Sequence, residues 1–184
     1  SGGRDKLIVS PGWSPDQSDK PAYRLIGAAN TLCVGDEPLL SPVAGRFGEL
    51  LNFALLGAAY RLRSRRVDAE DTGTLLEMEH EGWRPKFGLK HERRFYIDTA
   101  RDELLTPVDP KKSLAATAPY TVRFTLHPEV QASMARDKKS ILLRGPGGRG
   151  WWLRHDAREV ALEEGHVFGR DGLRKTVLVT LRGT

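Results

Sequence analysis

The sequence predicts an all-β fold, an antiparallel β-sandwich of many short strands. Apolar and polar residues alternate with a period of two over much of the chain after residue 58, as they do on half-buried strands. Turn-forming clusters separate these segments, among them Asp71-Thr72-Gly73, Gly145-Pro146-Gly147-Gly148 and Arg170-Asp171-Gly172. Strands do not alternate with helical patterns, which argues against a parallel sheet.

The clearest alternation runs over Tyr120–His127, and Pro128 ends that strand because proline lacks the N–H that a strand ladder needs. The same pattern predicts strands at Trp151–Arg154 and Thr176–Leu181. Further strands are expected at Ala58–Asp68, Thr74–His80, Phe87–Asp98, Ser140–Arg144 and Glu159–Glu164.

The first third of the chain is less regular. Leu7–Ser10 has the pattern of a strand, Pro11–Pro21 that of a loop, and Ala22–Val34 has room for one or two strands. Gly45–Ala59 has apolar residues at helical spacing, but an ordered loop fits this segment equally well. The sequence therefore leaves the structure of residues 38–57 open.

Length and composition indicate one domain. The 184 residues are enough to bury a sizeable core, and no apolar run is long enough to span a bilayer. The start, Ser-Gly-Gly-Arg-Asp, suggests a piece of a longer protein.

The single cysteine, Cys33, has no partner for an internal disulfide and is expected in the core. The net charge of +5 favours a polyanionic partner or is simply a solvated basic surface.

The most informative segment for function is residues 79–96. On one regular strand over residues 87–97, a histidine and an arginine would share a face with apolar neighbours: Phe87, Leu89, His91, Arg93, Phe95 and Ile97. Burying His91 and Arg93 without partners would be costly. They are therefore either structural residues, paired or turned outward by a bulge, or a ligand-facing pair on a concave sheet.

Two other basic or aromatic features are open to two interpretations. Arg61, Arg63 and Arg65 would share one strand face, with Arg66 on the other, and form either a ladder for carboxylates and sulfates or a solvated face. Trp151-Trp152 could provide a platform for stacking a sugar, although adjacent residues point to opposite faces, so that one is expected in the core.

Hydrolase chemistry is not indicated. The five histidines are scattered, and no serine lies in a nucleophile elbow. Glu163 and Glu164 are adjacent on a predicted strand and so face opposite ways, which makes them poor glycosidase carboxylates.

Several segments, in order and with their spacing preserved, resemble bacterial heparinase II/III-like proteins. The stretch from His80-Glu-Gly-Trp83 to Phe87-Gly-Leu-Lys-His91-Glu-Arg93-Arg94-Phe-Tyr96 is similar to "HDGY … FGLxHRRxxYL", and Val122-Arg-Phe-Thr-Leu-His127-Pro128 to "VRFHLHP". Trp152-Leu-Arg154 and Leu162-Glu-Glu164 … Phe168-Gly169 resemble the strands that follow in the family. Asp5-Lys-Leu-Ile-Val-Ser10 … Ala28-Ala-Asn30-Thr-Leu32 stands where the family has "RLIVNxG … AAHSTL". The resemblance covers nearly the whole chain except residues 38–57.

The resemblance implies a parent with an N-terminal α/α toroid followed by this β-sandwich, residues 1–184, as a single domain. In the family the cleft between the two domains binds an acidic polysaccharide such as a glycosaminoglycan, which is cleaved by β-elimination at a uronate. The toroid supplies the catalytic tyrosine and a charge-neutralising asparagine, and the sandwich supplies a histidine. The resemblance also favours a periplasmic or secreted location.

Two departures from the family pattern qualify the expected chemistry. Asn30 stands at the position of the family histidine, and asparagine cannot relay a proton near neutral pH. A second histidine, a ligand in zinc-containing members, is replaced by Leu32. His91 resembles another zinc ligand, but one histidine does not make a site. We therefore expect no metal and no cofactor.

Asn30, His80, His91 and Arg93 are the candidate substrate-binding residues; the catalytic residues are unknown. The leading hypothesis is the sandwich domain of a polysaccharide lyase, inactive without its toroid and forming one wall of the cleft. The alternative is a non-catalytic module that binds acidic glycans. A nucleic-acid-binding domain is disfavoured, because charge alone suggests it.

Overall fold

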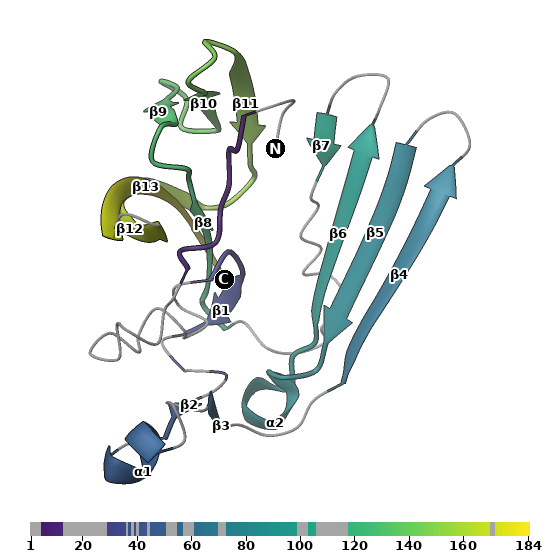
Figure 1. Ribbon diagram of the computed structural model, residues 1–184. Coiled ribbons are helices and arrows are strands. Elements are labelled where there is room, and N and C mark those ends of the chain that lie inside the picture. The colour runs from purple at the N-terminus through teal and green to yellow at the C-terminus, as the bar shows by residue number, and fades with distance from the viewer. Residues whose placement is uncertain are drawn as a thin grey trace. The chain divides into compact units, whose positions relative to one another are not determined.

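Antiparallel strands dominate the chain, and the predicted all-β fold is confirmed (Figure 1). The computed structural model describes residues 5–12, 29–35, 37, 39, 41–43, 45–50, 55–56, 61–69, 73–98, 103–105, 118–169 and 172–184. Its strands are β1 (Leu32–Val34), β2 (Ser41–Pro42), β3 (Leu55–Leu56), β4 (Leu62–Ala69), β5 (Gly73–His80), β6 (His91–Asp98), β7 (Glu103–Leu105), β8 (Tyr120–Thr125), β9 (Gln131–Met134), β10 (Ser140–Arg144), β11 (Gly150–Arg154), β12 (Glu159–Gly169) and β13 (Gly172–Gly183). The helices in this part of the chain are α1 (Gly45–Leu50) and α2 (Arg84–Phe87).

The chain divides into two compact units, residues 1–57 with 119–184 and residues 58–118. The single sandwich domain expected over residues 1–184 stays a prediction. Among the described residues, no helix has the length and hydropathy needed to cross a membrane.

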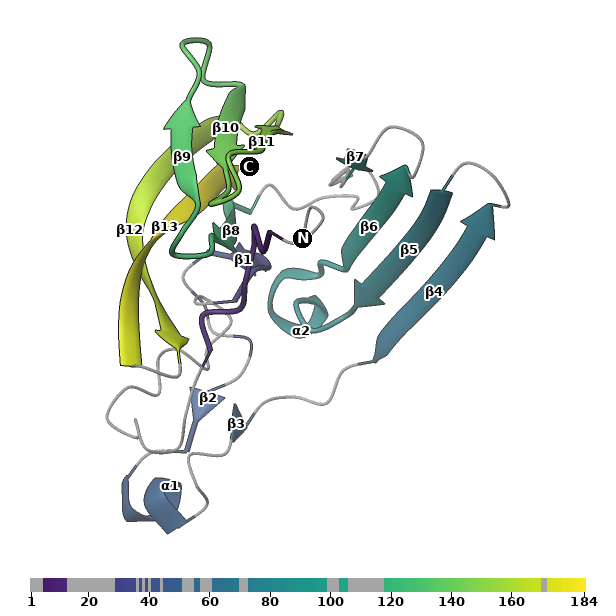
Figure 2. The ribbon, with the colours of Figure 1, turned by 45° about the horizontal axis from the view of Figure 1, so that its top comes forward.

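The first unit contains two larger antiparallel sheets (Figure 2). One has the strand order β1-β8-β13-β12 and the other the order β11-β10-β9, while β2 and β3 form a separate short pair. The N-terminal segment predicted as the strand Leu7–Ser10 pairs beside β8 through one isolated bridge, Ile8↔Leu126, and through the hydrogen bond from the Val9 N–H to the Thr125 carbonyl at 2.9 Å.

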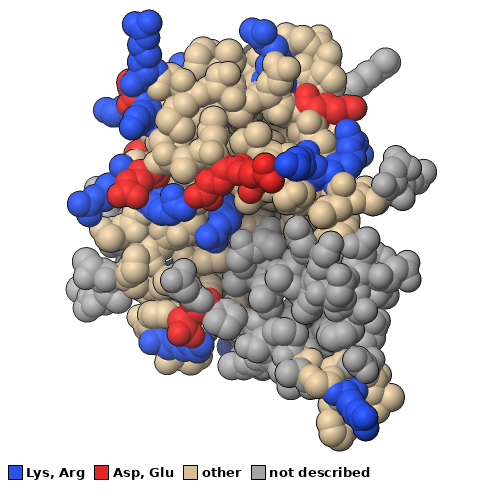
Figure 3. All heavy atoms as spheres, turned by 90° about the vertical axis from the view of Figure 1, so that its left-hand side faces the viewer, with Lys and Arg blue, Asp and Glu red and all other residues tan. Residues whose placement is uncertain are grey.

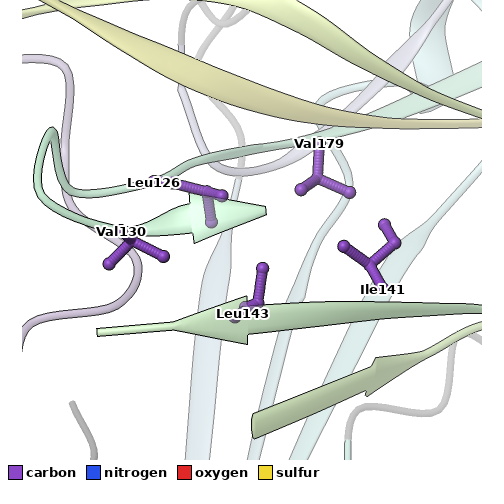
Figure 4. Packing of buried hydrophobic residues seen from close by; sticks show 5 residues of the cluster. All are labelled: Leu126, Val130, Ile141, Leu143 and Val179. Carbon is purple, nitrogen blue, oxygen red and sulfur yellow. The ribbon is translucent and has the colours of Figure 1, made fainter. Parts of the chain in front are cut away.

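Both of these sheets contribute side chains to one hydrophobic core (Figure 4). Val179 comes from β13, and Ile141 and Leu143 come from β10 in the other sheet. Leu126 and Val130, on the connection between β8 and β9, complete the buried cluster. Because two sheets pack on a shared apolar layer, this unit is a β-sandwich. Elsewhere in the unit, Cys33 is buried on β1, as the sequence predicted.

The second unit is a four-stranded antiparallel sheet in the order β4-β5-β6-β7. Each strand pairs with its neighbour in the chain, so the sheet is a simple meander. Strand β4 begins at Leu62, four residues later than the predicted start at Ala58.

The predicted strand Phe87–Asp98 is wrong at its start. Residues 84–87 form α2, with Pro85 in its first turn, and the strand begins only at His91. Gly88 ends the helix with a φ of 67°, and its N–H donates to the Arg84 carbonyl at 2.9 Å. Proline at a helix start and glycine just past its end are ordinary helix signals, so the sequence contained the information for this turn.

Other boundaries also differ from expectation. Helix α1 takes up only the first part of Gly45–Ala59, and β3 follows within the same segment. Strand β12 continues to Gly169, beyond the predicted end at Glu164. The predictions for residues 13–28 and for the turn residues 71–72 and 170–171 lie outside the described residues.

Candidate functional site

His80, His91 and Arg93 lie together on one face of the β5–β6 hairpin. Residues that are directly opposite in an antiparallel pair share a face. The register pairs His80 with His91 and Met78 with Arg93, and the next pair on this face is Leu76 with Phe95. We call these six residues the histidine face.

The two histidines are joined across the strands by a hydrogen bond. Nδ1 of His91 lies 2.9 Å from Nε2 of His80, and the rings meet edge to face with centroids 4.8 Å apart. Nδ1 of His80 accepts a hydrogen bond from the Gly82 N–H at 3.2 Å, so the proton of His80 is on Nε2. His80 therefore donates to His91, and His91 carries its own proton on Nε2.

Burial keeps this pair neutral at pH 7. It lowers the pKa of His91 to about 4, with smaller contributions from the nearby charges of His80 and Arg93. Burial also lowers the pKa of His80. A proton on Nδ1 of His91 would also face the N–H of His80 Nε2, which now donates to that atom, and the two N–H groups would repel each other.

Arg93 is the cation of the histidine face. Its Cζ atom lies 4.9 Å from the centroid of the Phe95 ring, within the range of a cation–π contact. Partial burial lowers the pKa of its guanidinium, yet arginine remains charged at neutral pH. The face thus combines two neutral imidazoles with one positive charge.

The opposite face of the same sheet is lined with ion pairs. Glu79 is paired with Lys90 and with Arg63, whose Nη1 lies 3.5 Å from its Oε1. Arg94 lies 3.2 Å from Glu77 and 2.6 Å from Glu92. The hydrogen bond from Lys90 is the main cause of a lowered pKa at Glu79. We call this the ion-pair face.

The predicted alternation of arginines is confirmed for Arg63, Arg65 and Arg66, whereas Arg61 lies before the start of β4. The surroundings of these arginines were not foreseen. Arg63 and Arg65 lie on the ion-pair face, opposite Glu79 and Glu77, while Arg66 lies on the other face. A shallow hollow of about 300 Å³ on this sheet is lined by Arg63, Ser64, Arg65, Glu77, Met78, Glu79 and Glu92. Since its own carboxylates offset the arginines, this face is a poorer receptor for anions than a free arginine ladder. The alternation of glutamates in β5 was the signal for this pairing.

Asn30 belongs to the other unit, where its side chain joins two backbone segments. Its Nδ2 donates to the Val9 carbonyl at 2.7 Å, and its Oδ1 accepts the Thr125 N–H at 2.6 Å. The amide thereby connects the N-terminal segment to the end of β8. Its predicted role in binding substrate stays a prediction, and no pattern in the sequence indicated this bridging role.

The expectation that no metal binds also stays a prediction. Within the described ranges, no three His, Cys, Asp or Glu side chains are grouped closely enough to hold a metal ion. His80 and His91 are a pair, and a structural zinc site needs four ligands. Elemental analysis of the purified protein tests this expectation directly, and stoichiometric zinc would overturn it.

On β12, Glu163 and Glu164 face opposite ways, as the sequence predicted. Glu163 accepts hydrogen bonds from Thr180 and Arg182, both at 2.6 Å, and these lower the pKa of its carboxyl. Glu164 is exposed and lies 3.4 Å from the Lys175 ammonium. Figure 3, which views the molecule from the side where β12 and β13 lie in Figure 1, shows acidic and basic side chains interleaved on that surface.

The histidine pair predicts that stability falls in mild acid. The pKa of His91 is about 4 in the fold, against about 6.5 in an unfolded chain, so between these values the unfolded chain binds a proton that the fold does not. The free energy of unfolding is then largest above pH 6.5 and decreases as the pH falls, by at most about 1.4 kcal/mol per pH unit for one proton.

Urea unfolding at pH 7.5, 6.5, 5.8 and 5.2 measures this dependence above the range where carboxyl groups titrate. His91→Gln should flatten the curve. An equally steep loss in that variant would contradict the assignment to His91.

One curated relative is similar along nearly the whole chain. It is the FtsZ-localized protein C of Caulobacter vibrioides (strain NA1000 / CB15N), 39% identical over 188 aligned residues that cover 97% of this chain and 32% of the relative. The chain therefore spans about a third of the length of that relative. No solved structure matches the chain.

The family model described as "Heparinase II/III-like, C-terminal" matches residues 1–184. The chain therefore belongs to the heparinase II/III-like family and corresponds to the family's C-terminal domain.

Proposed function

We propose that this chain forms one wall of a binding site for an acidic polysaccharide in a heparinase II/III-like parent protein. The observation that carries the proposal is the histidine face, which places His80, His91 and Arg93 together at the end of the β5–β6 hairpin where the connection between the strands begins. The family match over the whole chain supports the class of ligand.

These groups suit an acidic sugar. A guanidinium binds a carboxylate or sulfate through two parallel hydrogen bonds, and Arg93 carries its charge at neutral pH. His91 has one N–H, at Nε2, to donate to a sugar oxygen, and its neutral ring adds no charge that must be desolvated. Among the described residues, the ion-pair face has no imidazole, and Arg63 and Arg94 on it are paired with carboxylates.

Cleavage by the parent would proceed by β-elimination at a uronate. That reaction needs a base for the proton alpha to the carboxyl, a neutralising partner for the carboxylate and an acid for the leaving oxygen. The family resemblance assigns the tyrosine and the asparagine of this machinery to a toroid that is separate from the sandwich. We therefore propose that the chain binds the polysaccharide but does not cleave it alone.

A parent that binds without cleaving is the second candidate, and Asn30 favours it. The amide that replaces the family histidine already serves the Val9 carbonyl and the Thr125 N–H. The relative is named for its localisation with FtsZ rather than for a lyase activity, which is compatible with a binding protein. The upstream gene sequence separates the candidates, because a toroid that lacks the catalytic tyrosine would favour binding alone.

Arg93→Gln should weaken binding to heparin about tenfold, since a charge-assisted hydrogen bond contributes about 1.5–3 kcal/mol. Retention on immobilised heparin at a fixed ionic strength measures the change. Arg63→Gln is the matched control: it removes the same charge from the ion-pair face and should elute close to wild type. Equal loss of retention in both variants would mean that net charge, and not the histidine face, binds heparin.

The absence of cleavage by the chain alone is tested by absorbance at the unsaturated-uronate band. Heparin, alginate and hyaluronan should give no increase with the purified chain. A sustained increase would show that the sandwich carries a complete active site.

A further inference from the structure

A large aromatic side chain is exposed on the small sheet of the first unit. Trp152 retains 57% of its surface exposed, whereas Trp151, the preceding residue of β11, is partly buried. The two adjacent tryptophans therefore face opposite ways, as the sequence predicted, with Trp152 on the outer face. Burial of Ile141 and Leu143 in the core fixes which face of β10 is the inner one.

The register defines what surrounds Trp152. Trp152 lies opposite Leu142, Gly150 lies opposite Arg144, and Arg154 lies opposite Ser140. Together with the residues of β9 that pair with β10, the outer face consists of Gln131, Ser133, Ser140, Leu142, Arg144, Gly150, Trp152 and Arg154. A Cβ atom at Gly150 would lie only 3.3 Å from Cδ1 of Leu142, so the missing side chain leaves room for the leucine beside the indole.

Two arginines flank the indole, one on each side. Arg154 is two residues along the same strand, about 6.6 Å away at the backbone, and Arg144 is a diagonal neighbour at about 7–8 Å. Both arginines are exposed, and among the described residues no carboxylate lies within ion-pair distance of either. The outer face has no acidic residue on its three strands, in contrast to the ion-pair face.

We propose that this outer face is a second glycan-binding site, which stacks one sugar ring on Trp152 and holds its flanking anionic groups with Arg144 and Arg154. The C–H groups on the face of a pyranose carry slight positive charge and pack against the electron-rich face of an indole. Guanidiniums on both sides match carboxylates or sulfates repeated along a chain. Ser133 and Gln131 add hydroxyl and amide groups for sugar hydroxyls.

An acidic glycan fits this surface better than a single-stranded nucleic acid does. Nucleic-acid platforms stack successive bases on several aromatic side chains, and this face has one. The identity of the ligand rests on the proposed function, but the site does not use the histidine face. The two sites can therefore fail or succeed independently.

Calorimetric titration of the chain with a heparin octasaccharide tests the proposal. The titration is carried out in the Arg93→Gln background, so that the histidine face contributes little. Trp152→Ala should weaken the remaining binding about tenfold, by analogy with aromatic stacking platforms, and Trp152→Phe should retain most of it. Arg144→Gln and Arg154→Gln should each weaken it about fivefold. Arg174→Gln, an exposed arginine of β13, is the control of equal charge change and should stay within about twofold.

Two outcomes would overturn the proposal, and a third would separate it from the proposed function. Unchanged affinity in Trp152→Ala, or equal losses in Arg174→Gln and Arg144→Gln, would show that the outer face is not a site. Tighter binding of an oligo-dT of similar charge, with the same dependence on Trp152, would replace the glycan by a nucleic acid. Loss of the site on Trp152→Ala, combined with no effect of Arg93→Gln on wild-type binding, would support the outer face and reject the histidine face.

Discussion

Replacing Leu126 by alanine should destabilise the first unit by about 3 kcal/mol, the largest effect that we expect from a single core residue. Leu126 is completely buried and belongs to the cluster shared by the two sheets. Its backbone N–H donates to the Val177 carbonyl at 3.0 Å, and its carbonyl accepts the Thr176 hydroxyl at 2.6 Å. The backbone is thus held in place, so the structure has little freedom to collapse around the cavity that truncation leaves.

Urea unfolding, followed by far-ultraviolet circular dichroism, measures this loss. Leu173→Ala is the matched control, since Leu173 lies on β13 with 41% of its surface exposed, and it should cost well under 1 kcal/mol. Similar losses in the two variants would show that Leu126 is not at the centre of a packed layer.

Asn30→Asp should cost about 2–3 kcal/mol at pH 7, more than Asn30→Ala. The aspartate keeps an acceptor for the Thr125 N–H, but it places a carboxylate oxygen where Nδ2 now donates to the Val9 carbonyl. Two facing acceptors repel, and the charged form is disfavoured relative to an unfolded chain.

The pH dependence identifies that cause. Because the pKa of the new carboxyl would be raised in the fold, protonation stabilises the variant relative to its unfolded state, so its deficit against wild type should shrink as the pH falls from 7 to 5. The comparison uses unfolding curves of both proteins at each pH, which removes effects common to the two. A deficit that stays constant or grows towards pH 5 would contradict the Asn30 bridge.

The strands of the first unit were largely predictable from the sequence. The segment Ser140–Arg144 is a strand with the predicted ends, and β8 begins at the predicted Tyr120. In each strand, the side chains of one face pack on the core, and those of the other face point away from it. Residues in similar surroundings therefore recur along the sequence with a period of two. Helix α2 was missed because four residues are too few to show a helical period, although Pro85 and Gly88 mark its ends.

The candidate site was predictable only in part. That His91 and Arg93 share a face follows from their spacing, and the structure places them so. The hydrogen bond between His80 and His91 depends on the register of the β5–β6 hairpin, which α2 and its flanking residues set. The Asn30 bridge joins residues 95 positions apart in the chain, and no local pattern encodes such a contact.

The outer face of the small sheet was likewise predictable only in part. Opposite orientations of Trp151 and Trp152 follow from strand geometry alone. The position of Arg144 beside Trp152 required the pairing of β10 with β11, which places Arg144 opposite Gly150. Sequence spacing therefore identified the aromatic residue but not both of its basic neighbours.

The most direct test of the central proposal follows the imidazole signals of the chain by nuclear magnetic resonance during titration with a heparin octasaccharide. Single substitutions assign the signals of His80, His91 and His166, the last of which lies on β12 in the other unit. If the histidine face binds the glycan, the His80 and His91 signals will shift together and saturate, while the His166 signal stays in place. Heparin binding that leaves the His80 and His91 signals unmoved would contradict the proposal.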